Sequence, residues 1–103
     1  MEDIQNVQVV NNEKQQQFEI RYNDSVSMIP YNFKDDMIAL FHTEVEEKYR
    51  GKGLGSKLAL YALNYAKEHG LKILVYCPFI AKYIKLHPEW NPYVKHFIVS
   101  KQN

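Results

Sequence analysis

The stretch YRGKGLGSKL (residues 49–58) decides the fold of this chain, because it places three glycines within five residues among basic side chains. The whole sequence has only four glycines, and the fourth is Gly70. Before the stretch, residues 37–41 form the apolar run MIALF, and after it apolar residues recur at helical spacing from Leu54 to Ala66. The glycines therefore mark a turn between a buried strand and an amphipathic helix.

The sequence beyond this turn predicts a second strand and a second helix. The first helix is expected to end at Gly70, which suits a left-handed cap. LKILVYC (residues 71–77) then has the composition of a strand, so strand, turn, helix and strand form a βαβ unit with parallel strands and a right-handed crossover. Pro78 suits the first position of a second helix, which Pro88 stops. Residues 89–103 are ambiguous.

Upstream of the turn, four short runs predict an antiparallel meander of about four strands. They span residues 4–10, 17–23, 26–33 and 37–45. Pro30 cannot donate to a ladder, so it marks a bulge or an unpaired side in the third run. The apolar start of the fourth run is typical of a central strand covered on both faces. The predicted fold class is α+β or α/β: the meander, then a βαβ unit with a parallel fifth strand and a C-terminal helix.

Composition bounds the number of domains and the class of partner. The chain has 103 residues, of which 46% are hydrophobic and 24% charged, and this suits one globular domain over residues 1–103. A net charge of +1 gives no electrostatic reason to expect nucleic acid or an anionic membrane as a partner. One cysteine and four scattered histidines make a poor metal set. No apolar run approaches the roughly 20 residues of a membrane span, and the acidic, polar N-terminus is no secretory signal, so we expect a cytoplasmic location.

A glycine-rich turn in this setting can bind an anion. The glycines let the backbone present consecutive N–H groups, and the following helix adds its positive dipole end. Arg50, Lys52 and Lys57 add formal charge, so a phosphate or pyrophosphate is the natural ligand. The pattern matches neither the Walker loop nor the dinucleotide-binding fingerprint. The alternative is a plain turn between strand and helix with surface lysines.

A more specific match follows from residues 50–55, RGKGLG. They fit the pattern of Gln or Arg, two variable residues, Gly, one variable residue, and Gly or Ala. This resembles the acyl-CoA pyrophosphate loop of the GNAT superfamily of N-acetyltransferases, whose order of elements the predicted meander, loop, helix and parallel strand also follow. Over roughly residues 5–92, the chain looks like the very short, single-domain GNAT-like acetyl-CoA-binding proteins.

The resemblance implies a site for acetyl-CoA, or coenzyme A, along two segments. The amides of one segment should hold the pyrophosphate: Arg50, Gly51, Lys52, Gly53, Leu54, Gly55 and Ser56. The other, from His42 to Val45, should lie along the pantetheine arm, where the fourth and fifth strands splay apart. The amide of Thr43 or a neighbour would polarise the thioester carbonyl. The implied partners are acetyl-CoA and an amine acceptor that the sequence does not identify.

The sequence also departs from the larger family. The helices that build the acceptor pocket between the first two strands are missing, because about five residues join those strands here. The acceptor site is therefore missing, open or borrowed from a second subunit. Ala39 takes the place of a glutamate base that some members carry. Cys77 takes roughly the place of an asparagine, and Tyr83 is an approximate match for a tyrosine acid.

Four side chains are candidates for catalysis. His42 and Glu44 share one face of the predicted strand, so either could act as a general base. Cys77 is the N-cap of the second predicted helix, a setting that favours a thiolate able to take the acetyl group from CoA and pass it on. Tyr83 could act as an acid. The alternative for each is a structural role: a satisfied strand residue, a small buried hydrophobe or a core aromatic.

Two classes of function therefore remain. The first is an N-acetyltransferase that moves the acetyl group to an amine, directly or through Cys77. The second is an acyl-CoA-binding sensor or carrier without robust transferase activity, which the short chain and Ala39 favour. A third interpretation, an oligomeric interaction module, predicts no affinity for CoA. The aromatic content of 14%, which includes Tyr31, Trp90, Tyr93 and Phe97, and a short first strand that suits a sheet edge also predict a homodimer.

Overall fold

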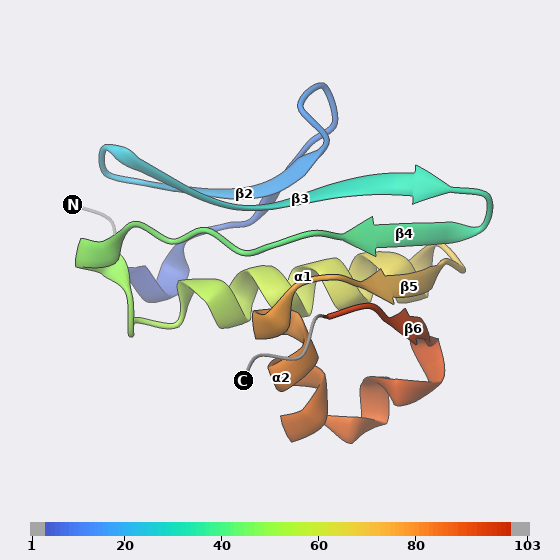
Figure 1. The fold of residues 1–103 in the computed structure, drawn as a ribbon. Coiled ribbons are helices and arrows are strands. Elements are labelled where there is room, and N and C mark those ends of the chain that lie inside the picture. Colours follow the sequence, from blue (N-terminus) through green and yellow to red (C-terminus); the bar gives the residue numbers. More distant parts are fainter. Residues whose placement is uncertain (1–3, 100–103) are drawn as a thin grey trace.

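The computed structural model describes residues 4–99, which form one six-stranded sheet with the strands in sequence order, from β1 to β6 (Figure 1). The strands are β1 (Val10–Asn12), β2 (Gln17–Tyr22), β3 (Ser25–Lys34), β4 (Met37–Leu40), β5 (Lys72–Val75) and β6 (Val94–Phe97). The helices are α1 (Leu54–Glu68) and α2 (Pro78–Leu86), with short 3-10 helices η1 (Ile4–Asn6), η2 (Glu47–Tyr49) and η3 (Pro88–Tyr93).

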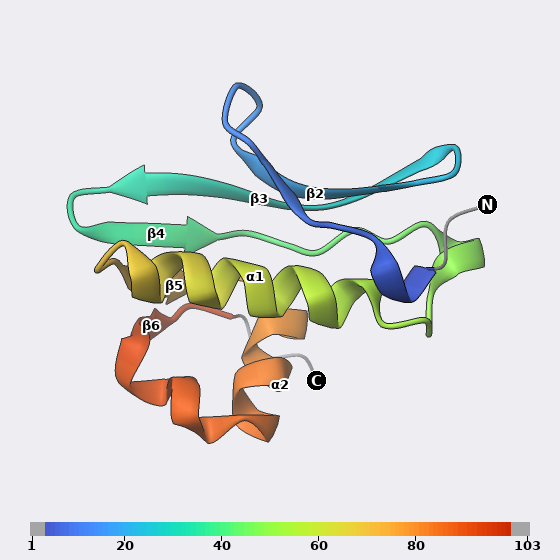
Figure 2. The same ribbon diagram turned by 180° about the vertical axis from the view of Figure 1, so that it is seen from behind.

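The predicted meander and βαβ unit are both confirmed. Strands β1 to β4 pair antiparallel, and β4 pairs with β5 in parallel. Helix α1 connects these two parallel strands and runs along the sheet, as Figure 2 shows from behind. Pro30 marks no bulge, because the β2–β3 register runs regularly up to its pairing with Gln17. Pro30 is the last residue of β3 that pairs with β2, and its carbonyl accepts from the amide of Phe41 at 3.2 Å.

The predicted strand over residues 4–10 is wrong in most of its length. Residues 4–6 form η1, and β1 starts only at Val10. The cause is tertiary: the side chain of Val7 is buried, and the Lys57 ammonium donates to the carbonyl oxygens of Gln5 and Val7, both at 3.1 Å. These contacts turn the segment onto α1 before it can join the sheet. The resulting β1 is a short edge strand, as expected.

The ends of the two helices follow the predicted signals. Gly70 has a φ of +66°, and the Leu71 amide reaches back to the Ala66 carbonyl at 2.9 Å, which is the left-handed cap that the sequence predicts. Pro78 opens α2, with Cys77 as its N-cap. Beyond α2, the ambiguous tail supplies η3 and then β6, which pairs in parallel with β5.

One apolar core lies between the sheet and the helices. Its aromatic centre is Phe18, whose ring lies 4.5 Å from that of Tyr31 and 5.2 Å from those of Tyr61 and Tyr65 on α1. Trp90 of η3 is also buried and belongs to this core. The glycine turn therefore follows η2, which has no buried residue, and leads directly into α1, whose Leu54 and Leu58 lie in this core.

Candidate functional site

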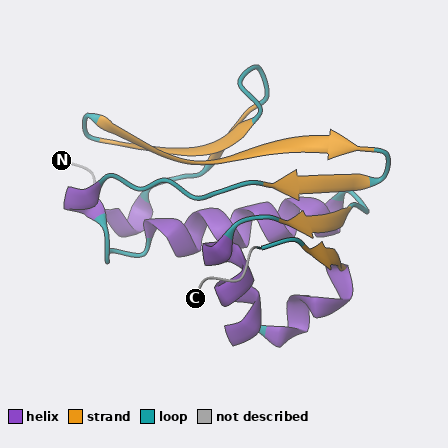
Figure 3. Cartoon of the chain, in the orientation of Figure 1, coloured by secondary structure: helices purple, strands orange, loops and turns teal. Residues whose placement is uncertain are grey.

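A β-bulge after β4 shapes the site. Leu40 pairs with Tyr31 and Glu44 pairs with Met28, so this chain advances four residues while its partner advances three. One extra residue reverses the alternation of side chains. Before the bulge Leu40 packs in the core, and after it Val45 does. The predicted strand over residues 37–45 thus ends at residue 40 and continues as an irregular extended segment, drawn as a loop in Figure 3.

After Leu40, the chain that continues β4 diverges from the chain that continues β5, as the resemblance implied. The last backbone hydrogen bond between them runs from the Tyr76 amide to the Leu40 carbonyl at 3.0 Å, after which β5 leads into α2 (Figure 1). Glu44 exchanges two backbone bonds of 2.9 Å with Met28, on the β3 side. The peptide groups of Thr43 and Val45 therefore point the other way, into the opening. Within residues 4–99, neither amide has a hydrogen-bond acceptor.

The glycine turn has the backbone conformation that an anion site needs. Gly51 and Gly53 have φ values of +79° and +91°, in the region that favours glycine. The first bond of α1 runs from the Lys57 amide to the Gly53 carbonyl at 3.0 Å, so the amides of its first three residues are free of helical acceptors. No side chain caps this end of the helix. The helix is 15 residues long, so its dipole adds to these free donors.

These two segments line one cavity of about 440 Å³, the glycine-loop pocket. Its lining residues are Thr43, Val45, Tyr49, Arg50, Gly51, Gly53, Leu54, Gly55, Ser56 and Phe79. Eight of the nine residues predicted for the cofactor are among them, and Lys52 is the exception. The structure thus brings together the two segments that the resemblance implies for pyrophosphate and pantetheine, which are close in the chain but belong to different elements.

The three basic side chains of the turn have different surroundings. Arg50 lines the pocket, and its Nε donates to the Val45 carbonyl at 3.0 Å, which ties the turn to the segment after β4. Lys52 is exposed and lines no described cavity. The Lys57 ammonium is bonded to the N-terminal segment, as described above. Arg50 is therefore the formal positive charge in the pocket itself.

Cys77 lies beside this site but is itself buried. Only 1% of its surface is exposed, and its Sγ lies 3.2 Å from the Thr43 Oγ1 across the gap between the two strands. The thiol does not cap α2, although Cys77 occupies the N-cap position. Thr43 thus separates the sulfur from the glycine-loop pocket, and any reaction of the sulfur requires the acyl group to reach past that side chain.

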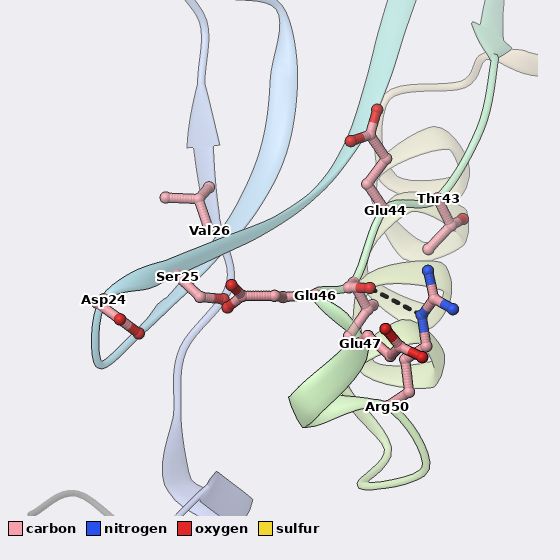
Figure 4. Close-up of a pocket in the computed structure, with 9 residues that line it drawn as sticks. Asp24, Ser25, Val26, Thr43, Glu44, Glu46, Glu47 and Arg50 are labelled. Carbon is pink, nitrogen blue, oxygen red and sulfur yellow. Dashed lines mark hydrogen bonds between the residues drawn. The ribbon is translucent and has the colours of Figure 1, made fainter.

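A second cavity, of about 510 Å³, lies on the other side of residues 43–47, and we name it the acidic pocket (Figure 4). Its lining residues are Asp24, Ser25, Val26, Thr43, Glu44, Val45, Glu46, Glu47 and Arg50. His42 and Glu44 do share a face, and the His42 Nε2 lies 2.6 Å from the Glu44 Oε2. Glu44 lines the acidic pocket, and neither Glu44 nor His42 is among the residues that line the glycine-loop pocket.

Tyr83 and the remaining histidines lie away from both pockets. The Tyr83 ring packs on the core and lies 4.3 Å from the ring of His87. Burial raises the pKa of Tyr83, and the nearby Glu89 raises it further, so the phenol stays protonated at neutral pH.

Among residues 4–99, no cluster of three or more His, Cys, Asp or Glu side chains could hold a metal ion. No described helix is long and apolar enough to cross a membrane.

Sequence reasoning missed part of both pockets. Tyr49 and Phe79 line the glycine-loop pocket, and their positions next to Arg50 and Pro78 were the available signal. Phe79 is close enough that a Cβ added to Gly55 would meet its ring at 2.9 Å. The β2–β3 turn, which supplies Asp24 to the acidic pocket, carries no local sign of this role, because its contact with residues 43–47 depends on the fold of the whole sheet.

Known proteins resemble this chain in both sequence and structure. Residues 17–94 match the family model of the GCN5-related N-acetyl-transferases. Protein NATD1 of Gallus gallus is 35% identical over 85 residues, which cover 80% of this chain and 77% of that protein. Protein NATD1 of Danio rerio is 34% identical over 96 residues, which cover 87% of this chain and 86% of that protein.

A solved structure supports the same assignment. A GCN5-like protein from Staphylococcus aureus, determined in solution by NMR, superposes with a TM-score of 0.69 at 25% identity. The match covers 91% of this chain and 93% of that one, so the two proteins share one fold along almost their whole length. The family match extends from β2 to the start of β6 and includes the whole glycine-loop pocket. This chain therefore belongs to the GCN5-related N-acetyltransferase family.

Proposed function

We propose that this protein binds acetyl-CoA in the glycine-loop pocket and transfers the acetyl group to an amine. The observation that carries the proposal is the set of free backbone amides, at the start of α1 and at Thr43 and Val45, that face one cavity. The first group suits a pyrophosphate and the second suits the amides of a pantetheine arm. Arg50 adds a positive charge between the two groups.

The chemistry needs a held thioester and a neutral amine. Acetyl-CoA, when bound, supplies an acetyl group activated as a thioester. The amine nitrogen forms a bond to the carbonyl carbon, the C–S bond breaks, and the CoA thiolate takes up the proton that the amine loses. A backbone amide such as that of Thr43 would stabilise the negative charge that develops on the carbonyl oxygen. The His42–Glu44 pair is the candidate for relaying the proton.

Direct attack by the amine fits the surroundings of Cys77 better than an acyl-cysteine does. A sulfur that is 1% exposed and in contact with the Thr43 hydroxyl is placed as a packing group. The route through Cys77 keeps one favourable feature, its position at the start of α2. In that route the Cys77 thiol gives its proton to the departing CoA thiolate, forms an acetyl thioester, and is released when the amine attacks.

A carrier or sensor of acyl-CoA is the second candidate function. It is favoured by Ala39, which is buried in β4 where some family members have a glutamate base. It is also favoured by the absence, within residues 4–99, of helices between β1 and β2. Both candidates require the same glycine-loop pocket, so they differ only in the transfer step.

One experiment separates these functions. The protein is titrated with acetyl-CoA by calorimetry, then incubated with acetyl-CoA and a panel of amines, and its intact mass and the acetylated products are measured. Binding with turnover supports the transferase, and binding without turnover supports the carrier. No binding contradicts both and favours an interaction module.

The same incubation, repeated with Cys77→Ala, separates the two routes. Turnover by this variant at the rate of the parent, with no adduct on the parent, establishes direct attack. A hydroxylamine-labile acetyl adduct on the parent alone, with loss of turnover in the variant, establishes the acyl-cysteine. Circular dichroism of the variant checks that the loss of a buried side chain has not unfolded the protein.

A further inference from the structure

We infer that the acidic pocket holds a protonated amino group of the acceptor, so that the acceptor is a small alkyl amine with a second ammonium group. This inference rests on the proposed function, and it specifies the substrate class of the same site. The pocket lies between the β2–β3 turn and residues 43–47, as Figure 4 shows.

The charge of the pocket selects a cation. Four carboxylates line it, from Asp24, Glu44, Glu46 and Glu47. Two positive groups face them: Arg50 in the lining, and Lys48, whose ammonium lies 3.4 Å from Asp24 and 4.0 Å from Glu46. Counting His42 as neutral, two negative charges remain without a counter-charge. A pocket of this sign repels the phosphates of CoA, so it is no extension of the cofactor site.

A buried hydroxyl gives a second and independent sign of a ligand. Ser25 is 7% exposed, and its Oγ has no hydrogen-bond partner among the described residues. Ser25 is among the residues that line the acidic pocket, and in the view of Figure 4 its side chain lies on the side of β3 that faces Glu46. A buried hydroxyl without a partner is costly. An ammonium group, which has three donors and no acceptor, would satisfy the Ser25 oxygen together with the carboxylates.

The position of the pocket allows a ligand to reach the reaction site. Thr43 and Val45 line both the acidic pocket and the glycine-loop pocket. The Thr43 hydroxyl also contacts Cys77, at the carboxyl ends of β4 and β5. An elongated ligand with its ammonium between Ser25 and Glu46 can extend along residues 43–45 and present its other end near Thr43. The cavity of about 510 Å³ is of the size that holds a small molecule.

A second ammonium group also helps the chemistry. The attacking nitrogen must be neutral, whereas alkyl amines are mostly protonated at neutral pH. A positive charge a few bonds away makes the reacting nitrogen easier to deprotonate, because two like charges repel. The pocket would stabilise the charged end alone, and the His42–Glu44 pair at its rim could accept the proton of the other end.

The test compares two amines of equal length. NMR amide shifts of residues 43–47 are followed while 1,5-diaminopentane or pentylamine is added to the protein, with and without CoA. We expect the diamine to bind at least about tenfold more tightly than the monoamine, and transfer to follow the same order in kcat/KM. Replacing both carboxylates, in the variant Glu46→Gln/Glu47→Gln, should abolish this preference. Glu68→Gln, which removes a charge at the far end of α1, should leave the preference intact.

The binding measurement needs no turnover, so the two proposals can fail separately. Equal binding of the two amines, or a preference that survives in the double variant, overturns the acidic pocket even if acetyl-CoA binds and turns over. A much stronger response to a lysine-containing peptide than to the diamine also overturns it. Failure of acetyl-CoA to bind, with the diamine preference present, instead overturns the proposed function and leaves the cation site established.

Discussion

At the scale of single residues, the glycine turn depends on backbone conformation more than on charge. Gly53 has a φ of +91°, and no protein atom lies within 4 Å of a Cβ added there. A side chain at this position would therefore meet no protein atom, but it would enter the space in which we propose that the pyrophosphate binds. We expect Gly53→Val to lower the affinity for acetyl-CoA at least about tenfold, or roughly 1.4 kcal/mol. Isothermal titration calorimetry measures the change.

Gly70 supplies the matched control for backbone strain. It also has a positive φ, of +66°, and open space around an added Cβ, but it lies at the other end of α1. Gly70→Val should therefore cost a similar amount of stability and leave the affinity for acetyl-CoA unchanged. If both variants bind acetyl-CoA like the parent, the glycine turn does not hold the pyrophosphate.

Arg50 should contribute less than the glycines. It is exposed, and its Nε is already bonded to the Val45 carbonyl, so its charge acts on a ligand partly through solvent. We expect Arg50→Ala to weaken acetyl-CoA binding by less than about tenfold, and the difference from the parent to shrink as salt rises. Titrations at low and high salt test this, and a loss that does not depend on salt would mean that Arg50 acts by shaping the turn.

At the scale of elements, the sequence predicts what local signals determine. The helical spacing from Leu54 onward, the cap at Gly70 and the apolar run before the glycines identify α1, β4 and β5, and hence the glycine-loop pocket. The bulge between Leu40 and Glu44 could not be predicted, because it depends on the register with β3 and changes no local pattern. Its consequence is that Val45, and not Glu44, packs against the core, and that Glu44 lines the acidic pocket.

The 3-10 helix at residues 4–6 and the strand β6 were also not predicted, because tertiary contacts determine the structure of both segments. The Lys57 ammonium holds residues 5–7 on α1, whereas the sequence assigned its charge to the phosphate site.

We expect Lys57→Met to lower the free energy of unfolding by about 1 kcal/mol and to speed hydrogen exchange of residues 4–9. Acetyl-CoA affinity should stay within about twofold of the parent. A large loss of affinity with normal exchange would return Lys57 to the phosphate site.

At the scale of the whole molecule, apolar side chains are exposed at the ends of three neighbouring strands. Phe41, Tyr76 and Phe97 are 37%, 37% and 50% exposed, and the first two rings lie 5.3 Å apart. Such a group favours association with a second copy. We expect a homodimer at tens of micromolar protein, measured by light scattering, and a shift toward monomer in Phe97→Ser. A monomeric parent at that concentration would contradict this prediction.

The stability of the whole domain should fall in acid because of one buried carboxylate. Glu19 in β2 is 2% exposed, and its oxygens accept hydrogen bonds from Gln17 and from Asn12 at 2.8 Å, with the Arg21 guanidinium at 3.3 Å. Burial alone would raise the pKa of Glu19, but the hydrogen bonds and the positive charge of Arg21 outweigh burial and lower it. The hydrogen bond from Asn12 joins β1 to β2, so it stabilises the edge of the sheet.

The lowered pKa of Glu19 determines how the stability of the protein changes with pH. A carboxyl group whose pKa is lower in the folded state stabilises the protein fully above the pKa of the unfolded chain, near 4.3 for glutamate. The contribution is lost as pH falls from there through the pKa of folded Glu19. We therefore expect Glu19→Gln to be less stable than the parent at pH 7 and to lose less stability on acidification.

Urea unfolding at pH 7 and pH 3 measures both quantities, with Glu13→Gln as the control, because Glu13 is an exposed carboxylate in the adjacent turn. If the gap in stability between the parent and Glu19→Gln is the same at both pH values, the proton of Glu19 is not linked to folding.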